Sequence, residues 1–429
     1  MIVVCEPQCK SISHEKVNSG FLYGLRLAFP DDKILFYADQ THIDAIKNIL
    51  KHDKINIGNI EYAPIQFFNT ESVFAFVRYN SLLAKIFTQV IALNLKQIFF
   101  LSFSPKILYL IKKLKQKKKF ASLKFSFVLH GDFENIAKKD MAVNSDPEDF
   151  DFPGLKASFK DKILKLSLAD VPKKAFHLSK KITGKLTAPF KNKFNQRFTN
   201  EKIMPWQHTG DYKYIALAPY ILTNAAAYLN VSELGFSSVV LPTVFAPPVP
   251  QPENEYPKFA IFGFGNPKKL RKILSKLSQK GVEKPYEIRI IGMDSGLEMF
   301  PNVFCPSPGK RLPRDEMEKY AIDVDLFLNL YTKNQYRLSC SNSILESLSY
   351  MKPTLHFDND CLNFFDTKEL PIGICCDNDE QYVTAMVDII DNYGEYHEKF
   401  SSIRENILLL RDKYAIENAV TEIRSSFTW

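Results

Sequence analysis

The chain has 429 residues, which is long for a single ordinary core and suits two domains of about 150–250 residues each. Hydrophobic residues make up 45% of it and charged residues 24%, a globular composition that excludes wholesale disorder. The formal net charge of +8 favours an anionic partner, such as nucleotide phosphates, anionic lipid or nucleic acid. No run of about 20 apolar residues occurs, so no segment is expected to cross a membrane.

The cysteines give no sign of a metal site or a disulfide framework. Their number is odd, and no pair has the double CxxC spacing of a zinc site. Residues 1–5 predict a buried strand rather than a signal peptide. We therefore expect reduced thiols in a cytoplasmic protein. The cysteines are Cys5, Cys9, Cys305, Cys340, Cys361, Cys375 and Cys376.

The first half of the chain alternates apolar runs typical of buried strands with amphipathic stretches typical of helices. The strands are predicted at 1–5, 33–39, 97–102, 124–130, 214–219 and 239–244. The helices are predicted at 21–29, 41–51 and 105–115, with Thr41 as the N-cap of the second. Strands and helices in this order predict a parallel, doubly wound α/β sheet.

A second alternation follows a proline-rich stretch at 246–257, APPVPQPENEYP, which is the best interdomain linker in the sequence. We therefore place the domains at 1–245 and 258–415, with a separate C-terminal helix in 416–429. Strands are predicted at 259–265, 286–292, 303–309, 325–330 and 354–357, and helices at 344–350, 380–393, 396–414 and 416–426.

The most informative stretch is 323–360, which predicts a strand, a polar loop, a helix, a tight turn and a strand. Its loop, 339–343, contains small residues with hydroxyl or amide side chains that suit a helix N-terminus. Such a loop at the carboxyl edge of a parallel sheet can cradle a phosphate. Glu346 lies in the first turn, where its carboxylate could reach a ribose hydroxyl. Alternatively, Ser343 and Glu346 form a capping box, and the carboxylate only holds the Ser343 amide.

The Ser-Ile-Leu-Glu sequence of 343–346, its apolar helix and the following Lys-Pro resemble the donor-nucleotide motif of retaining glycosyltransferases with the GT-B fold, of the family 4 (group 1) type. The segments 259–265, 286–292 and 303–309 resemble the first three strands of that donor domain, in the same order. The resemblance departs at two positions: Leu338 stands where the family often has a second Glu, and Phe264 where an Arg is usual.

The resemblance implies two Rossmann-like domains whose parallel sheets face each other across a cleft. It also implies a last helix that crosses back onto the first domain, a nucleotide diphosphate sugar as donor, and no cofactor.

The loops after strands of the first domain supply the acceptor-side candidates. His14, Glu15 and Asn18 follow the first strand, although this segment could simply begin a helix, with Ser13 as N-cap and Lys16 pointing outward. His130 ends a later strand, where it could serve as a base or hydrogen-bond partner for an acceptor hydroxyl. Asp132 could orient His130 or act itself. Alternatively, His130 could merely hydrogen-bond a neighbouring loop. The catalytic candidates are His130, Asp132 and His14.

The loops of the second domain supply the donor-side candidates. Glycines after its first strand allow the backbone to approach a ligand, and basic side chains offset diphosphate charge as the leaving group departs. Tight turns use glycine everywhere, however, and the lysines could simply face solvent. The donor-binding candidates are Gly263, Gly265, Lys268, Lys269, Lys310, Arg311, Ser341, Ser343 and Glu346.

Three Asp-x-Asp strings raise the alternative of a metal-bridged donor diphosphate, as in GT-A glycosyltransferases. Short Asp pairs are common by chance, so we interpret them as turn and loop residues and predict no metal site. They are Asp149 with Asp151, Asp323 with Asp325, and Asp358 with Asp360.

Residues 156–202 hold thirteen Lys or Arg against three Asp or Glu, and 112–119 form a second basic cluster. Phenylalanines are interleaved with the first of these runs. A solvated helix face is the ordinary explanation of such a run. Lysine mixed with apolar residues is also how a protein rests on anionic lipid, so we expect membrane-surface contact. No nucleic-acid-binding motif accompanies the charge.

These patterns together predict a metal-independent glycosyltransferase that moves a sugar from a nucleotide diphosphate sugar to a glycan or lipid-linked glycan, in bacterial surface polysaccharide synthesis. It would lie in the cytoplasm, at the inner face of the membrane. Two alternatives stay open: a nucleotide-sugar epimerase of the same fold, and a scaffold of that fold that binds nucleotide or lipid without turnover.

Overall fold

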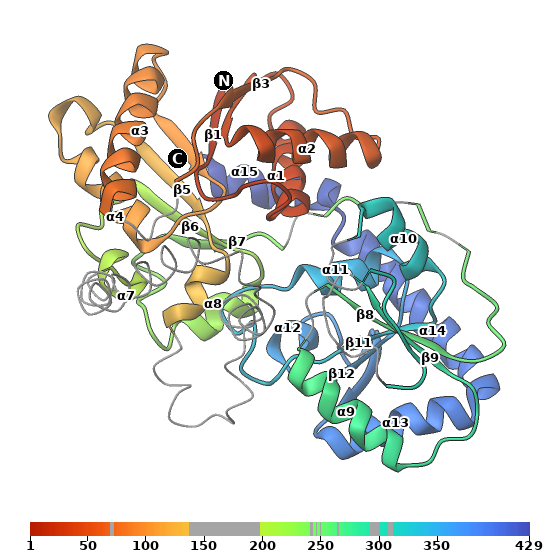
Figure 1. Ribbon diagram of the computed structural model, residues 1–429. Helices are drawn as coiled ribbons and strands as arrows, with labels where there is room; N and C mark the ends of the chain where they lie inside the picture. The colour runs from red at the N-terminus through yellow and green to blue at the C-terminus, as the bar shows by residue number, and fades with distance from the viewer. Residues whose placement is uncertain are drawn as a thin grey trace, which may run out of the picture.

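The computed structural model describes residues 1–68, 73–136, 198–240, 243–245, 247–248, 250–263, 266–291, 300–307 and 312–429 (Figure 1). Two parallel sheets, each accompanied by helices, organise these residues. The α/β class and the two Rossmann-like halves expected from the sequence are therefore confirmed. No helix within the described ranges is long and apolar enough to cross a membrane.

The first sheet has the order β3-β2-β1-β4-β5-β6-β7, and all its strands are paired in parallel. The chain order reverses between β1 and β4, which creates a crevice at the carboxyl ends of these strands. The strands are β1 (Ile2–Glu6), β2 (Ile34–Ala38), β3 (Ile60–Pro64), β4 (Gln97–Phe100), β5 (Lys124–Val128), β6 (Tyr212–Ala216) and β7 (Phe236–Ser238). The helices are α1 (Glu15–Ala28), α2 (Gln40–His52), α3 (Val73–Ala92), α4 (Pro105–Lys115), η1 (Lys118–Phe120), η2 (Gly131–Ile136), α7 (Asn200–Ile203) and α8 (Pro219–Ala225).

The second sheet has the order β10-β9-β8-β11-β12-β13, also parallel, and reverses between β8 and β11. Its strands are β8 (Lys258–Phe262), β9 (Glu287–Ile291), β10 (Val303–Phe304), β11 (Leu326–Asn329), β12 (Thr354–Phe357) and β13 (Gly373–Cys376). Its helices are α9 (Pro267–Gln279), α10 (Arg314–Ile322), α11 (Asn342–Ser349), α12 (Asp360–Asn363), α13 (Asp379–Asp391) and α14 (Tyr393–Lys413).

Two predicted boundaries in the first half are wrong. The last strand is β7, which ends before the predicted range of 239–244; within that range Thr243 makes an isolated bridge to Ala415. The N-cap of α2 is Asp39, whose carboxylate accepts hydrogen bonds from both the amide and the hydroxyl of Thr41. An aspartate two residues earlier satisfies the free Thr41 amide, so Thr41 becomes part of the helix.

Aromatic side chains, many of them phenylalanines, fill the centre of the first domain. The ring centroid of Phe127 lies 5.3 Å from that of Phe100 and 5.7 Å from that of Tyr214, on three neighbouring strands. All three side chains are fully buried. Cross-strand aromatic packing of this kind makes the sheet a rigid platform for the loops at its edge.

The C-terminal segment returns to the first domain. After α14, the short helix η6 (Ile416–Ala419) and α15 (Val420–Phe427) pack against α1 (Figure 1). The Phe427 ring centroid lies 4.2 Å from that of Phe99, and Phe427 is only 1% exposed. A Cβ added to Gly24 would lie 2.5 Å from Ile423, so a glycine in α1 allows the two helices to approach this closely.

A buried histidine in the second domain contributes to the stability of the fold in a pH-dependent way. His356 on β12 is fully buried, and its Nε2 lies 2.9 Å from the Asp366 carboxylate. Burial lowers the pKa of His356, but the bond to Asp366 outweighs it and raises that pKa to about 9. The unfolded value is about 6.5, so the pair stabilises the fold fully below pH 6.5 and loses its contribution as the pH rises through 9.

We expect an Asp366→Asn protein to lack this alkaline loss. Between pH 6 and pH 10, urea unfolding should show a decrease in the free energy of unfolding, on the order of 3 kcal/mol, in the wild type relative to the variant. The comparison matters because burial lowers the pKa of Lys352 to about 7, which makes stability increase over the same range. If the free energy of unfolding changed with pH in the same way in both proteins, the raised pKa of His356 would be contradicted.

Candidate functional site

The crevice of the first domain is shaped by a buried carboxylate at the end of β1. Glu6 is 0% exposed and accepts hydrogen bonds from the amides of Gln8 (2.8 Å) and Cys9 (3.0 Å), the hydroxyl of Ser102 and the amide nitrogen of Asn18 (3.2 Å). These bonds connect β1 and α1 to the loop after β4. Asn18 is itself fully buried. It therefore lies behind the loop surface, and not on the acceptor-facing side expected from the sequence.

Two of the predicted catalytic residues lie together at this crevice. The ring centroids of His14 and His130 are 4.5 Å apart, although the residues follow different strands. His14 has φ 54 and occupies the N-cap of α1, without a side-chain capping bond. Ser13 is therefore not the cap that the alternative interpretation proposed. His130 Nε2 lies 2.7 Å from the Leu101 carbonyl oxygen, to which it donates, so Nδ1 is left as the acceptor nitrogen.

The surroundings of both histidines favour the neutral imidazole. Burial, with a further contribution from His14, lowers the pKa of His130 to about 3. Desolvation also lowers the pKa of His14; the charge of Glu6 opposes this effect and His42 adds to it. A neutral imidazole fixed through Nε2 is well suited to accept a hydrogen bond at Nδ1 and is a weak general base.

The crevice of the second domain contains the N-terminus of α11. Its N-cap is Ser341, whose hydroxyl accepts from the Ser343 amide (3.2 Å) and lies 2.7 Å from the Tyr331 hydroxyl. Gly263, in the turn after β8, has φ +86, and a Cβ there would lie 2.8 Å from the Ser343 hydroxyl. The predicted glycine and serines therefore meet at one helix N-terminus, whose amides and dipole favour an anion.

Glu346 is neither a capping residue nor an accessible one. The helix begins at Asn342, so a capping box between Ser343 and Glu346 is not formed. Glu346 is 2% exposed, and Arg314 donates to its two carboxylate oxygens at 2.8 and 2.9 Å. Lys16, from α1 of the first domain, donates to it at 3.1 Å. Burial raises the pKa of Glu346, but the charges of Lys16 and Arg314 outweigh burial and lower it.

The loop between β11 and α11 is also held by the first domain. Glu134 of η2 accepts from the Leu338 amide (2.7 Å) and the Ser339 hydroxyl (2.9 Å). Tyr220 of α8 donates to the Ser339 carbonyl at 2.5 Å, and Asn224 donates to the Arg337 carbonyl at 2.9 Å. A carboxylate therefore reaches the backbone at Leu338 from the opposite domain.

The remaining predicted site residues are more scattered. Glu15 is half-buried at the start of α1, and Lys268 is exposed on α9. Lys269 pairs with Asp379 at 2.5 Å and lies over the Phe357 ring, which ties α9 to α13. Three predicted site residues, Gly265, Lys310 and Arg311, lie outside the described residues, and the side chain of Asp132 is not described either.

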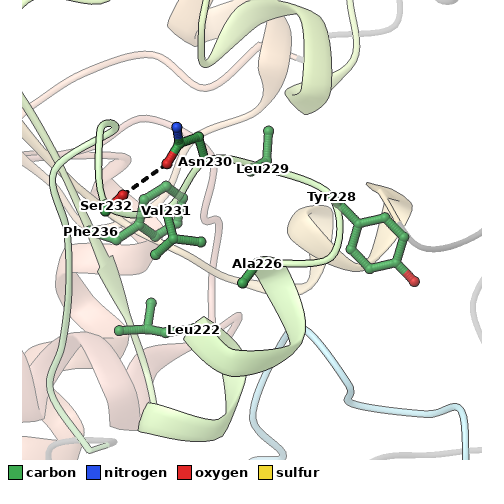
Figure 2. Close-up of a pocket in the computed structure, with 8 residues that line it drawn as sticks. All are labelled: Leu222, Ala226, Tyr228, Leu229, Asn230, Val231, Ser232 and Phe236. Carbon is green, nitrogen blue, oxygen red and sulfur yellow. Dashed lines mark hydrogen bonds between the residues drawn. The ribbon is translucent and has the colours of Figure 1, made fainter.

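A groove of about 630 Å³ runs along the boundary of the two domains. Glu15 and His52 lie on its first-domain side, and Pro313 and Arg314 on its second-domain side. A larger hollow of about 720 Å³ lies beside α8, lined mainly by apolar side chains such as Leu222, Tyr228 and Phe236 (Figure 2). None of the described candidate site residues lines that hollow, whereas Glu15 lines the interdomain groove, together with Arg314, which binds Glu346.

The two described Asp pairs have structural partners. Asp323 binds Lys258 and Arg289, and Asp325 accepts from the Lys258 amide. Asp358 lies 3.3 Å from Lys333, and Asp360 accepts from Asn224. Within the described part of the chain, no three His, Cys, Asp or Glu residues form a group that could hold a metal ion. The pair Asp149 and Asp151 lies outside that part.

The basic cluster at 112–119 is only partly a surface feature. Lys112 is buried and donates to the carbonyls of Met204 and Trp206, at 2.6 and 2.7 Å. Lys115 is buried as well and donates to the carbonyls of Ala121 and Leu123. The exposed members are Lys113, Lys117, Lys118 and Lys119. Most of the other basic run, 156–202, lies outside the described residues.

Solved structures with the same architecture identify the fold. A glycosyltransferase from Rickettsia africae ESF-5 superposes with a TM-score of 0.56 at 10% identity, over 99% of this chain and 97% of that one. HepE (Alr3699) from Anabaena, in complex with UDP and glucose, superposes with a TM-score of 0.55 at 12% identity, over 99% of each chain. The chain has the GT-B fold. A further similar structure is the catalytic domain of starch synthase IV from Arabidopsis thaliana, bound to ADP and acarbose. It superposes with a TM-score of 0.55 at 9% identity, over 99% of each chain.

No protein-family model matches the sequence, and no curated protein matches it either. The resemblance to GT-B glycosyltransferases noted in the sequence is confirmed at the level of the fold, and its narrower assignment to family 4 is not.

Sequence reasoning missed five residues that hold the site together: Lys16, Arg314, Glu134, Tyr220 and Glu6. Lys16 was expected to point outward if its segment merely began a helix, whereas it is 9% exposed and faces α11. Glu6 left one usable signal, because a carboxylate at the end of an apolar strand must find partners. Lys16, Glu134 and Tyr220 act across the domain boundary, and Arg314 reaches Glu346 from a neighbouring helix, so spacing along the sequence carries no information about these contacts.

Proposed function

We propose that this protein transfers a sugar from a nucleotide diphosphate sugar to a glycan or lipid-linked glycan acceptor, without a metal ion. One observation carries the proposal: the carboxyl ends of both sheets meet, because Lys16 at the start of α1 lies 3.1 Å from Glu346 in α11. Reversals of strand order in such sheets are where ligands bind. The UDP bound to HepE and the ADP bound to starch synthase IV agree with a nucleotide donor.

In this proposal the second domain binds the donor. The amides of the first turn of α11, beside Gly263 and Ser343, would hold the diphosphate and stabilise its charge as the sugar leaves. The first domain would bind the acceptor. His130 would accept a hydrogen bond from the acceptor hydroxyl at Nδ1, with His14 beside it. Glu346 as a ribose contact stays a prediction, because Arg314 and Lys16 engage its carboxylate.

We further propose an acceptor of bacterial surface polysaccharide synthesis, and a location at the cytoplasmic face of an anionic membrane. The exposed lysines at 113 and 117–119 support the membrane contact through their charge. The Glu346 carboxylate is already bound by Lys16 and Arg314. This favours one alternative function, a scaffold that binds its ligand without turnover.

The test is nucleotide binding without metal. At one hundred times the dissociation constant, a bound ligand adds about 2.7 kcal/mol of apparent stability. We expect UDP, ADP or GDP to raise the melting temperature in the presence of EDTA. Gly263→Ala should weaken that binding about tenfold, the equivalent of about 1.4 kcal/mol, because its Cβ presses on Ser343.

Gly281→Ala is the matched control. Gly281 has φ +63 with nothing within 4 Å of an added Cβ, so this variant has the backbone strain without the contact. Its nucleotide affinity should equal that of the wild type. A response only with Mn²⁺ would contradict the metal-independent mechanism, and no response to any nucleotide would contradict the donor site. Transfer to an acceptor, rather than epimerisation or binding alone, would then separate the three functions.

A further inference from the structure

The Glu346 carboxylate is shared by the two domains. Arg314, from the second domain, binds it in a bidentate manner, with hydrogen bonds of 2.8 and 2.9 Å to its two oxygens. Lys16, from the first domain, makes a single contact with Oε2 at 3.1 Å and also lies 3.4 Å from the Ser349 hydroxyl. Lys16 and Glu346 are 9% and 2% exposed, so this ion pair is largely screened from water.

Lone pairs limit what this carboxylate can bind. A carboxylate has about four acceptor positions, and the two side chains already direct three donors at it. Two vicinal hydroxyls of a ribose would bring the number of donors to about five, so one present donor must leave. Paired hydrogen bonds from a guanidinium are stronger and more rigid than a single ammonium contact. Lys16 is therefore the donor that is displaced.

We propose that Lys16 is an interdomain latch on Glu346, and that the ribose of the nucleotide displaces it from that carboxylate. The inference rests on the proposed function, since it assumes that a nucleotide binds at α11. Binding then releases one connection between α1 and α11, which couples arrival of the donor to the freedom of the domains to move. The latched state also lowers the apparent affinity, because only the unlatched fraction can accept the ribose.

Calorimetric titration of Lys16→Met with UDP, ADP and GDP tests the competition. The variant keeps the length of the side chain and loses its charge, so we expect binding about fivefold tighter than in the wild type. Lys16→Arg should keep the latch and the wild-type affinity. Lys33→Met is the control, because Lys33 belongs to the same domain and pairs with Glu61 on the surface. Unchanged or weaker binding by Lys16→Met would overturn the proposal.

Hydrogen exchange gives a readout that needs no nucleotide. Lys16→Met should increase amide exchange in the first turn of α1 and in α11, and Lys33→Met should not. Equal exchange in Lys16→Met and wild type would overturn the latch even if nucleotides bind. If no nucleotide binds either protein, the proposed function fails and the competition with it, while exchange still decides whether Lys16 holds the domains together.

Discussion

A Glu346→Ala protein should be less stable than the wild type by about 3–5 kcal/mol. The substitution leaves Lys16 and Arg314 facing each other in a largely buried space without the carboxylate that compensates them. An uncompensated buried charge costs more than the ion pair contributed, so the loss exceeds that of an ordinary truncation. Chemical unfolding monitored by circular dichroism measures it directly.

The companion variants separate charge from packing. Lys16→Met combined with Glu346→Gln removes an anion and a cation together and should recover part of the stability. Glu380→Ala removes a carboxylate that also binds two lysines, Lys276 and Lys280, but on the open surface of α13. Its unfolding curve should match that of the wild type, because exposed ion pairs contribute little. An equally small effect of Glu346→Ala would mean that the buried cluster is not a source of stability.

Phe427→Ala should also cost about 3–5 kcal/mol. The ring is 1% exposed and lies between Phe21 and Phe99, at centroid distances of 6.4 and 4.2 Å. Truncation leaves a cavity that the flanking helix and strand cannot close, since the sheet beneath is packed with aromatic rings. The loss should appear as a lower denaturant midpoint with an unchanged slope.

Trp429→Ala is the control for Phe427→Ala. The indole is 38% exposed and lies 5.0 Å from the ammonium groups of both Lys124 and Lys213. Contacts of this kind at exposed sites are worth about 0.5–1 kcal/mol, so the midpoint should change little. If the two variants lose the same stability, α15 is not part of the first domain's core.

The sequence predicts strands best where they are short apolar runs between polar or glycine-containing segments. Residues 325–330 contain such a run, and β11 spans Leu326–Asn329 within it. The edge strand β3 and the helix α3 fall in a stretch for which no prediction was made. β3 is partly exposed along its length and has no continuous apolar run. The strand predicted at 239–244 is wrong because β7 ends at Ser238, and Thr243 makes only an isolated bridge to Ala415.

The site was predictable as a set of loops and not as a set of contacts. Reversal of strand order follows from the α/β pattern, so His14, His130, Gly263 and Ser343 could be placed at carboxyl edges. The environment of Glu346 could not, because Lys16 lies 330 residues away and no periodicity links the two. The two buried members of the 112–119 cluster show the same limit, since each lysine is drawn inward by carbonyl groups that only the fold assembles.

The packing of α15 on α1 has a consequence for synthesis of the protein. Arg424 of α15 hydrogen-bonds the carbonyl of Ala28, which precedes it by 396 residues. At about 5–20 residues per second, a ribosome adds these residues over about 20–80 s. During that time the nascent first domain exposes the apolar side of α1 that Ile423 and Phe427 later cover. The first domain therefore completes its packing only after α15 has been synthesised, and until then the growing chain passes through a stage in which aggregation or chaperone capture competes with folding.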